Sequence, residues 1–249
     1  MHVAATCKDS GPFPTILPGQ ETPLTASPLK AVVFDAYGTL LDVHGAMQRH
    51  AAKLPPDWER ISVEWRQKQL EYTWVSTLTG PSHHRDFWQI TKDSLAFVAA
   101  RHRITDPDVL AGLLAAYRQL PAYPDAAPML RALRARGLRT AILSNGEPGM
   151  LHEAVDAAGI ASLLDAVLSV EDVRVFKPDP RVYGLAASTF GLSLPQMGFV
   201  SSNAWDAQAA AAAGFQVFWC NRSGQPEEYG LGQSATVMQG LADLPGLLA

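Results

Sequence analysis

The sequence predicts an α/β protein in which a doubly wound parallel sheet carries an inserted helical domain. Two observations predict the sheet: continuous apolar runs alternate with helical patterns, and four of the helical segments are each followed by a glycine. A third observation predicts the insert, because residues 46–122 contain helical patterns and no convincing strand. A chain of 249 residues suits one large domain, or one domain with a smaller insert.

Residues 1–28 come first and are rich in Pro, Gly, Ser and Thr, which favours a flexible leader. They lack the positive segment and the apolar stretch of roughly 7–15 residues that mark a secretory signal. No apolar run in the chain approaches the roughly 18 residues of a membrane span. The chain has 2 cysteines, which excludes a disulfide framework. Together these features favour a cytoplasmic protein.

Five apolar runs are the expected strands, and continuous apolar strands are typical of a parallel sheet covered on both faces. They lie at 31–36, 139–146, 165–170, 197–203 and 215–221. We expect helices between them at 126–136, 148–158, 180–190 and 205–213, each ending before a glycine. The alternation predicts a Rossmann-like core domain in two pieces, 29–45 and 123–249.

The stretch from 46 to 122 interrupts this alternation. Apolar side chains recur at helical spacing in three segments, 57–78, 86–101 and 108–120. We therefore expect a helical cap domain inserted after the first strand. Open α/β sheets bind ligands at the carboxyl ends of their strands, and a cap placed there would cover such a site.

Polar side chains follow the expected strands at the carboxyl edge of the sheet. Asp35 ends the first strand, Ser144 and Asn145 end the second, and Lys177 follows the third. Ser201-Ser202-Asn203 ends the fourth, with Asp206 just beyond. Parallel strands bring these ends to one edge, so the groups can converge in one cleft. Taken singly, a serine such as Ser144 or Ser201 is more often a turn or capping residue.

At these residues the chain resembles the haloacid dehalogenase superfamily. The run FDAYGTLLD (34–42) is similar to its first motif, and Ser144-Asn145-Gly146 to its second. Lys177 before Pro178 is similar to the third motif, and residues 201–206 to the fourth. The similarity is closest to the L-2-haloacid dehalogenases, which WRQKQLEYTW (65–74), FKPDPRVYGLA (176–186) and VSSNAWDAQAAAAAGF (200–215) resemble, and it covers residues 30–245.

This resemblance implies hydrolysis of short-chain (S)-2-haloalkanoic acids to (R)-2-hydroxyalkanoic acids and halide, through an ester on Asp35. It implies catalytic functions for Asp35, Thr39, Arg66, Ser144, Lys177, Tyr183, Ser201, Asn203 and Asp206. It implies pocket positions for Tyr37, Gln67, Leu70, Phe87, Asn145 and Trp205. Lys177 is expected to keep Asp35 ionised, while Arg66 with Asn145 and Phe87 would receive the halide. No metal or other cofactor is expected.

One departure from the superfamily's phosphatases determines the subclass. Those enzymes generally carry Asp two residues after the nucleophile, whereas this chain carries Tyr37. Phosphoryl transfer needs a proton donor for a poor leaving group and neutralisation of several oxygens, but halide leaves without a proton. A magnesium-dependent phosphatase, a phospho-acceptor domain of the receiver type and an inactive binding protein remain the alternatives.

The expected partners are small molecules. The net charge of −4 makes a nucleic-acid partner improbable, and no membrane partner is expected. The ligands would be a 2-halocarboxylate and the released halide. Relatives are commonly homodimers, so the resemblance also implies a homodimer.

Overall fold

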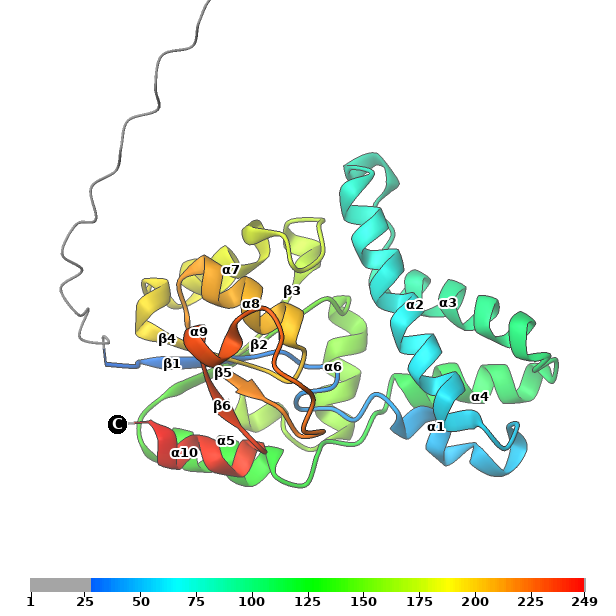
Figure 1. Ribbon diagram of the computed structural model, residues 1–249, viewed down its shortest axis with the longest axis horizontal. Helices are drawn as coiled ribbons and strands as arrows, with labels where there is room; N and C mark the ends of the chain where they lie inside the picture. The colour runs from blue at the N-terminus through cyan, green and yellow to red at the C-terminus, as the bar shows by residue number, and fades with distance from the viewer. Residues whose placement is uncertain (1–27, 249) are drawn as a thin grey trace, which may run out of the picture.

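The computed structural model describes residues 28–248, so the expected leader at 1–28 lies outside the described residues apart from its last one. Within them, six strands form one parallel sheet in the order β3-β2-β1-β4-β5-β6 (Figure 1). The strands are β1 (Ala31–Phe34), β2 (Arg139–Ser144), β3 (Ala166–Ser169), β4 (Met197–Ser201), β5 (Gln216–Cys220) and β6 (Ala235–Met238). The predicted α/β class with a doubly wound parallel sheet is confirmed.

The first strand occupies the middle of the sheet. Val33 of β1 pairs with Ala141 of β2 on one side and with Phe199 of β4 on the other. The chain runs outward from β1 to β2 and β3, then returns to the opposite side of β1 for β4, β5 and β6. Ligands of open α/β sheets bind at such a reversal of strand order. The carboxyl ends of β1 and β4 are therefore the place where a site is expected.

Helices cover both faces of this sheet, with α5 and α10 on one face and α7 and α8 on the other (Figure 1). The helices of this part are α5 (Ala126–Ala135), α6 (Pro148–Ala157), α7 (Pro180–Phe190), α8 (Ala204–Ala213), α9 (Leu231–Ser234) and α10 (Leu244–Leu247). The start and stop signals are local. Asp179 caps α7 by accepting from the Arg181 N–H, and Gly191 ends it in the left-handed conformation at φ 62°.

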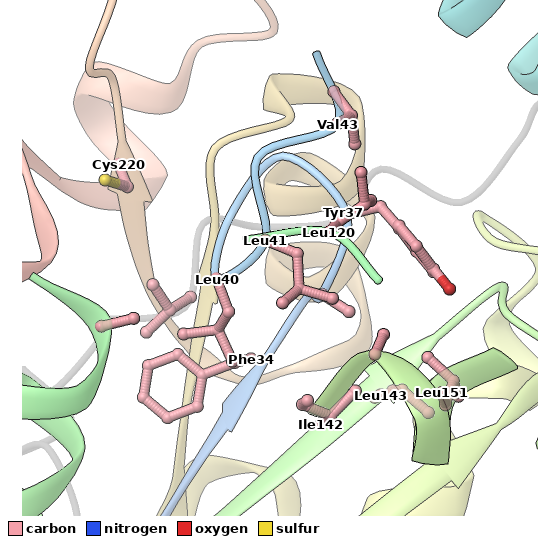
Figure 2. Close-up of a cluster of buried hydrophobic side chains, with 14 of the residues drawn as sticks. Phe34, Tyr37, Leu40, Leu41, Val43, Leu120, Ile142, Leu143, Leu151 and Cys220 are labelled. Carbon is pink, nitrogen blue, oxygen red and sulfur yellow. The ribbon is translucent and has the colours of Figure 1, made fainter. Parts of the chain in front are cut away.

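The loop after β1 is anchored by its own apolar side chains. Leu40 and Leu41 are fully buried in the hydrophobic cluster that also contains Phe34 and Ile142 (Figure 2). Tyr37 lies in the same loop, but its ring points away from Leu40 and Phe34. Burying each leucine contributes about 1.5–3 kcal/mol, so the loop is held against the end of the strand from which it emerges.

The remaining helices gather beside the layered part (Figure 1). They are α1 (Gly45–Arg49), α2 (Trp58–Leu78), α3 (Phe87–His102) and α4 (Pro107–Tyr117). Helix α2 packs against α3, and α1 packs against α4. The two chain segments that lead into and out of these helices pair with each other, since the Asp42 N–H donates to the Pro121 carbonyl over 2.9 Å. The helices are thus inserted at one point of the core chain.

Strand β6 and the short helices α1, α9 and α10 were not expected from the sequence. Strand β6 lies at the sheet edge with only Met238 buried, so it presents no apolar run. Helix α1 is 5 residues long, too short to show a helical period. The expected strands also end earlier in the structure, because polar residues such as Asp35 and Asn145 lie in the loops beyond them. Within residues 28–248, no helix is both long and apolar enough to cross a membrane.

Candidate active site

Asp35 lies at the carboxyl end of the central strand. Its N–H donates to the Val200 carbonyl over 2.9 Å, which extends the β1–β4 pairing by one residue and fixes the backbone. The residue is 5% exposed. Thr39 Oγ1 and Asn203 Nδ2 both donate to Oδ2, over 3.1 and 2.8 Å, and Lys177 Nζ donates to Oδ1 over 3.2 Å. One carboxylate oxygen therefore receives two neutral donors and the other receives an ammonium.

Lys177 links two carboxylates at the floor of this site. It is 1% exposed, and its Nζ lies 2.8 Å from Asp206 Oδ2 and 3.2 Å from Asp35 Oδ1. Burial favours the neutral amine, but the charges of Asp206 and Asp35 outweigh it and raise the pKa of Lys177. The side chain is thus a cation in the folded protein at neutral pH. Lys177 also donates its N–H to Asn145 Oδ1 over 2.9 Å, which joins the loops after β2 and β3.

Asp206 is fully buried at the start of α8. Burial raises its pKa, the Lys177 charge opposes this, and the charge of Asp35 adds to the rise. The Tyr183 hydroxyl of α7 donates to Asp206 Oδ1 over 2.6 Å. Burial and the Asp206 charge hold the pKa of Tyr183 well above its ordinary value, so the phenol keeps its proton and acts as the donor.

The two serines of the predicted site form local turns. Ser144 Oγ accepts the Gly146 N–H and Ser201 Oγ accepts the Asn203 N–H, each over 3.1 Å. These are the turn contacts that single serines usually make at strand ends. The Ser201 contact orients the backbone of Asn203, so its effect on Asp35 is indirect. Thr39 differs, because its hydroxyl reaches the Asp35 carboxylate directly.

Arg66 brings the inserted helices into the site. From α2 its Nη2 donates to the Tyr37 carbonyl over 3.2 Å, and Asn203 Nδ2 reaches the same oxygen over 3.3 Å. The Tyr37 ring lies 5.6 Å from Phe87 of α3 and 5.7 Å from Tyr117 of α4, measured between centroids. The Tyr37 hydroxyl is buried with no partner among the described residues, and burial raises its pKa well above the ordinary value.

Of the other predicted pocket residues, two lie on the side of α2 that faces the core and one lies on its outer side. Trp205 of α8 meets Trp74 of α2 edge to face, with centroids 5.7 Å apart, and half-buried Leu70 lies one turn beyond Arg66. Gln67 does not fit its expected place, because it is exposed and lines a groove of about 430 Å³ on the outside of α2 with Glu64. Neighbouring residues of a helix point about 100° apart, so Arg66 and Gln67 face different surroundings.

Several supporting residues were not anticipated from the sequence. Gln69 is buried in α2, where it accepts from the Tyr117 hydroxyl over 3.1 Å and donates to Thr91 over 3.0 Å. Its signal was the spacing of four residues from Trp65, which is also buried. Arg222 follows β5 and donates to the Thr39 carbonyl over 3.3 Å. The rule used for the other strands, polar residues at the carboxyl end, would have identified Arg222 too.

No cluster of three or more His, Cys, Asp or Glu side chains within residues 28–248 is arranged to hold a metal ion. The groups that converge are instead one ammonium, two carboxylates, a guanidinium, hydroxyls and amides. A buried carboxylate with an ammonium on one oxygen and donors on the other can attack an electrophilic carbon and form an ester. The same donors can then stabilise charge on the ester oxygen.

Known proteins are similar to this chain in sequence and in fold. A family model described as haloacid dehalogenase-like hydrolase matches residues 29–214. (S)-2-haloacid dehalogenase 1 of Pseudomonas sp. (strain CBS-3) is 44% identical over 222 residues, which are 89% of this chain and 97% of that protein. (S)-2-haloacid dehalogenase 4A of Burkholderia cepacia is 43% identical over 89% of this chain and 95% of its own. The structure of L-2-haloacid dehalogenase from Xanthobacter autotrophicus with chloropropionic acid covalently bound matches with a TM-score of 0.79 and 38% identity, over 88% of this chain and 98% of that one.

Proposed function

The chain belongs to the haloacid dehalogenase-like hydrolase family, and we propose that it is an (S)-2-haloacid dehalogenase that acts through Asp35. Such an enzyme converts a short-chain (S)-2-haloalkanoic acid and water into an (R)-2-hydroxyalkanoic acid and halide. The observation that carries the proposal is the setting of the Asp35 carboxylate, buried between Thr39, Asn203 and Lys177. The relatives are named for this reaction, and the related structure with covalently bound chloropropionic acid fits an ester intermediate.

The hydrogen bonds of Asp35 indicate which oxygen attacks. A carboxylate oxygen has two lone pairs, and those of Oδ2 are occupied by the donors from Thr39 and Asn203. Within the described residues, Oδ1 accepts only from Lys177 and keeps one lone pair. Oδ1 attacks the α-carbon in line, a carbon–oxygen bond forms, and the carbon–halogen bond breaks with its electron pair leaving on the halide. In-line attack inverts the α-carbon, which accounts for an (R) product.

Cations make the encounter of two anions possible. Lys177 lies against Asp35 and offsets its charge, as the substrate carboxylate approaches the same edge of the sheet. Arg66 is the second cation and reaches the loop that carries Asp35. We propose that Arg66 receives the departing halide, with Asn145 and Phe87 beside it, while Tyr37, Leu70 and Trp205 line the pocket.

The second step uses the donors on the other oxygen. In the ester, Oδ2 is the carbonyl oxygen, and charge develops on it as water adds to the Asp35 carboxyl carbon. Thr39 and Asn203 already donate to that oxygen, which is the arrangement of an oxyanion hole. Asp206 takes one proton from the water and returns it to the departing alkoxide, and the other proton is released to solvent. Its raised pKa makes Asp206 a stronger base than an ordinary aspartate.

The residue two positions after Asp35 argues against phosphatase chemistry. Tyr37 is buried against Phe87 and Tyr117, and its raised pKa means that its hydroxyl does not readily give up a proton. A phosphate ester needs such a proton for its leaving group, whereas halide does not. This position therefore supports the dehalogenase assignment.

Chloride release from (S)-2-chloropropionate tests the proposed function. We expect release without added metal, undiminished by EDTA, with (R)-lactate as the product by chiral chromatography. In a single turnover in heavy-oxygen water, mass spectrometry should find the label in peptides that contain Asp35. Hydrolysis of p-nitrophenyl phosphate with magnesium and no halide release would overturn the assignment, and unlabelled Asp35 would overturn the ester intermediate.

We also propose that residues 46–122 act as a cap domain over the core of 29–45 and 123–249. The contact of Arg66 with the Tyr37 carbonyl supports this, because it places a side chain of the inserted helices at the loop of Asp35. Tryptic cleavage between α2 and α3, around 81–85, should be slowed by a saturating substrate analogue. Cleavage that ignores the analogue would count against a cap over the site.

A homodimer is part of the proposal as well. Large apolar side chains stand exposed on the inserted helices: Val63 45%, Val75 53% and Leu78 86% on α2, with Phe97 39% on α3. A second copy of the chain would cover them. Sedimentation should give a dimer for the native chain and a monomer for Val75→Asp with Leu78→Asp, whereas a native monomer would remove the proposal.

We further propose a cytoplasmic location. Within residues 28–248 the buried thiol of Cys220 forms no disulfide, which fits a reducing compartment. Cell fractionation of the producing organism would decide, and recovery of the activity outside the cytoplasm would reject this location.

A further inference from the structure

We propose that Arg222, which follows β5, is a positioning residue for this reaction: by holding the Thr39 carbonyl it keeps the Thr39 hydroxyl on Asp35. This inference rests on the proposed function. It assigns Arg222 no contact with substrate. Its effect passes through the backbone of one residue to the oxygen on which charge develops during ester hydrolysis.

The guanidinium of Arg222 is fixed from three directions. Its Nη1 and Nη2 donate to the two carboxylate oxygens of Asp125, over 2.7 and 3.0 Å, as a fork. Asp125 is held in turn by the Leu241 N–H over 2.8 Å. The face of the guanidinium lies over the Tyr123 ring at 4.3 Å from its centroid. With its plane set in this way, Nη2 also donates to the Thr39 carbonyl over 3.3 Å.

Thr39 is therefore held by hydrogen bonds at both its backbone and its side chain. Its hydroxyl oxygen accepts the Ser202 N–H over 2.9 Å, so its one proton is left for Asp35 Oδ2 at 3.1 Å. Its carbonyl oxygen is the acceptor for Arg222. Because both groups belong to one fully buried residue, releasing the carbonyl lets the turn rotate and moves the hydroxyl away from Oδ2.

Only an arginine can make this set of contacts. The planar fork spans both oxygens of Asp125 and still presents an N–H to the Thr39 carbonyl. A lysine ammonium is a point charge that cannot occupy the fork and the third position together. Arg222→Lys therefore preserves the charge and removes the geometry.

The two steps of the reaction should respond differently. In the first step Oδ2 carries charge before attack, so the Thr39 donor stabilises the starting carboxylate as well as the transition state. In the second step charge develops on Oδ2 from a neutral ester, so the same donor acts mainly on the transition state. Loosening Thr39 should thus slow ester hydrolysis more than halide release, and the ester should accumulate on Asp35.

The test compares Arg222→Lys with Arg139→Lys. Like Arg222, Arg139 contacts a backbone carbonyl and an aromatic ring, but at the opposite end of the sheet: it donates to the Phe190 carbonyl over 3.0 Å and lies 4.5 Å from the centroid of that ring. For Arg222→Lys we expect kcat on (S)-2-chloropropionate to fall on the order of 10- to 100-fold. We expect KM to fall together with kcat and kcat/KM to stay within about twofold of the native value, because ester formation is little affected and only its hydrolysis is slowed. Rapid quenching and mass spectrometry should find esterified Asp35 peptide at steady state, and Arg139→Lys should match the native enzyme.

Each other outcome has a defined meaning. Native kcat in Arg222→Lys overturns the inference, as does a raised KM with unchanged kcat, which would make Arg222 a source of charge for the substrate. An equal fall in Arg139→Lys would reduce the effect to general stability and overturn it as well. If Arg222→Lys does not fold, Asp125→Asn tests the inference instead. We then expect a smaller fall in kcat with the same accumulation of ester. A native enzyme that releases no halide would instead defeat the proposed function and not the geometry of Thr39.

Discussion

The Tyr183 hydroxyl donates a hydrogen bond of 2.6 Å to Asp206 Oδ1, and both side chains are fully buried. Two effects on Asp206 oppose each other here. Burial raises the pKa of Asp206, whereas the hydrogen bond from Tyr183 lowers it by stabilising the carboxylate. Tyr183 therefore adds to the larger effect of the Lys177 charge in limiting the rise of the pKa of Asp206.

Tyr183→Phe removes that donor and should move the acid limb of the kcat profile to higher pH. The sign follows from the lost hydrogen bond: without it the carboxylate is less stable, the pKa of Asp206 rises further, and more alkaline solution is needed to ionise it. The check is kcat against pH for chloride release. The exposed Tyr229→Phe serves as control. A limb that stays in place or moves to lower pH would contradict a function of Asp206 as the base.

Lys177→Met should lower the free energy of unfolding by about 3–5 kcal/mol at pH 7, because it leaves two buried carboxylates without their cation. The loss should shrink as pH falls. The pKa of Asp206 is already raised by burial, and losing the Lys177 charge raises it further, so acid protonates the uncompensated group and removes its cost. Urea unfolding at pH 7 and pH 5 measures both values.

The matched control is Lys68→Met, whose ammonium pairs with Glu71 on the surface of α2. Surface pairs contribute about 0–1 kcal/mol, so this variant should differ little from the native protein at either pH. Equal losses at pH 7 and pH 5 for Lys177→Met would mean that its contribution is packing and not charge. Halide release should be lost in Lys177→Met whatever its stability.

The strands and helices of the core could be predicted because local signals mark each of them. Apolar runs marked β1 to β5, and glycines such as Gly191 ended the helices, so no long-range information was needed. Strand β6 was not predicted, because it pairs only with β5 and buries one side chain. Its position depends on pairing with β5, and a single sequence does not show which strands pair.

The same distinction between local and long-range information applies to the residues of the site. Asp35, Lys177 and Asp206 follow strands that were recognised, and the structure brings them within hydrogen-bond distance. Gln67 was assigned by resemblance alone, and the rotation of α2 turns it outward. Arg222 could have been listed as a polar residue after β5, but its contact with Thr39 could not be predicted, because it spans 183 positions of the chain and involves a backbone oxygen.

Asn203→Ala should convert the enzyme into one that stops after the first step. Asn203 Nδ2 donates to Asp35 Oδ2 over 2.8 Å, the oxygen that carries charge during ester hydrolysis. Removing one such donor costs on the order of 10²–10³ in rate. Stopped-flow measurement should show a burst of about one halide per active site, followed by slow turnover. Asn221→Ala, which loses contacts with the Gln225 carbonyl and the Gln225 N–H, should show no burst.

Arg66→Lys should impair dehalogenation by an amount that depends on the halogen. The guanidinium of Arg66 is placed at the loop of Asp35 by its 3.2 Å contact with the Tyr37 carbonyl, and the planar fork can keep that contact while another N–H faces the halide. A lysine ammonium could not contact the Tyr37 carbonyl and the halide at the same time. A poorer leaving group depends more on stabilisation of the developing anion, so the fall in kcat/KM should be larger for (S)-2-chloropropionate than for (S)-2-bromopropionate. For the chloride substrate we expect a fall on the order of 10²-fold.

Arg60→Lys provides the control on the same helix, because Arg60 is exposed and pairs only with Asp57 among the described residues. The same factor for both halogens would show that Arg66 attracts the carboxylate, or only holds the Tyr37 loop, and does not receive the leaving ion.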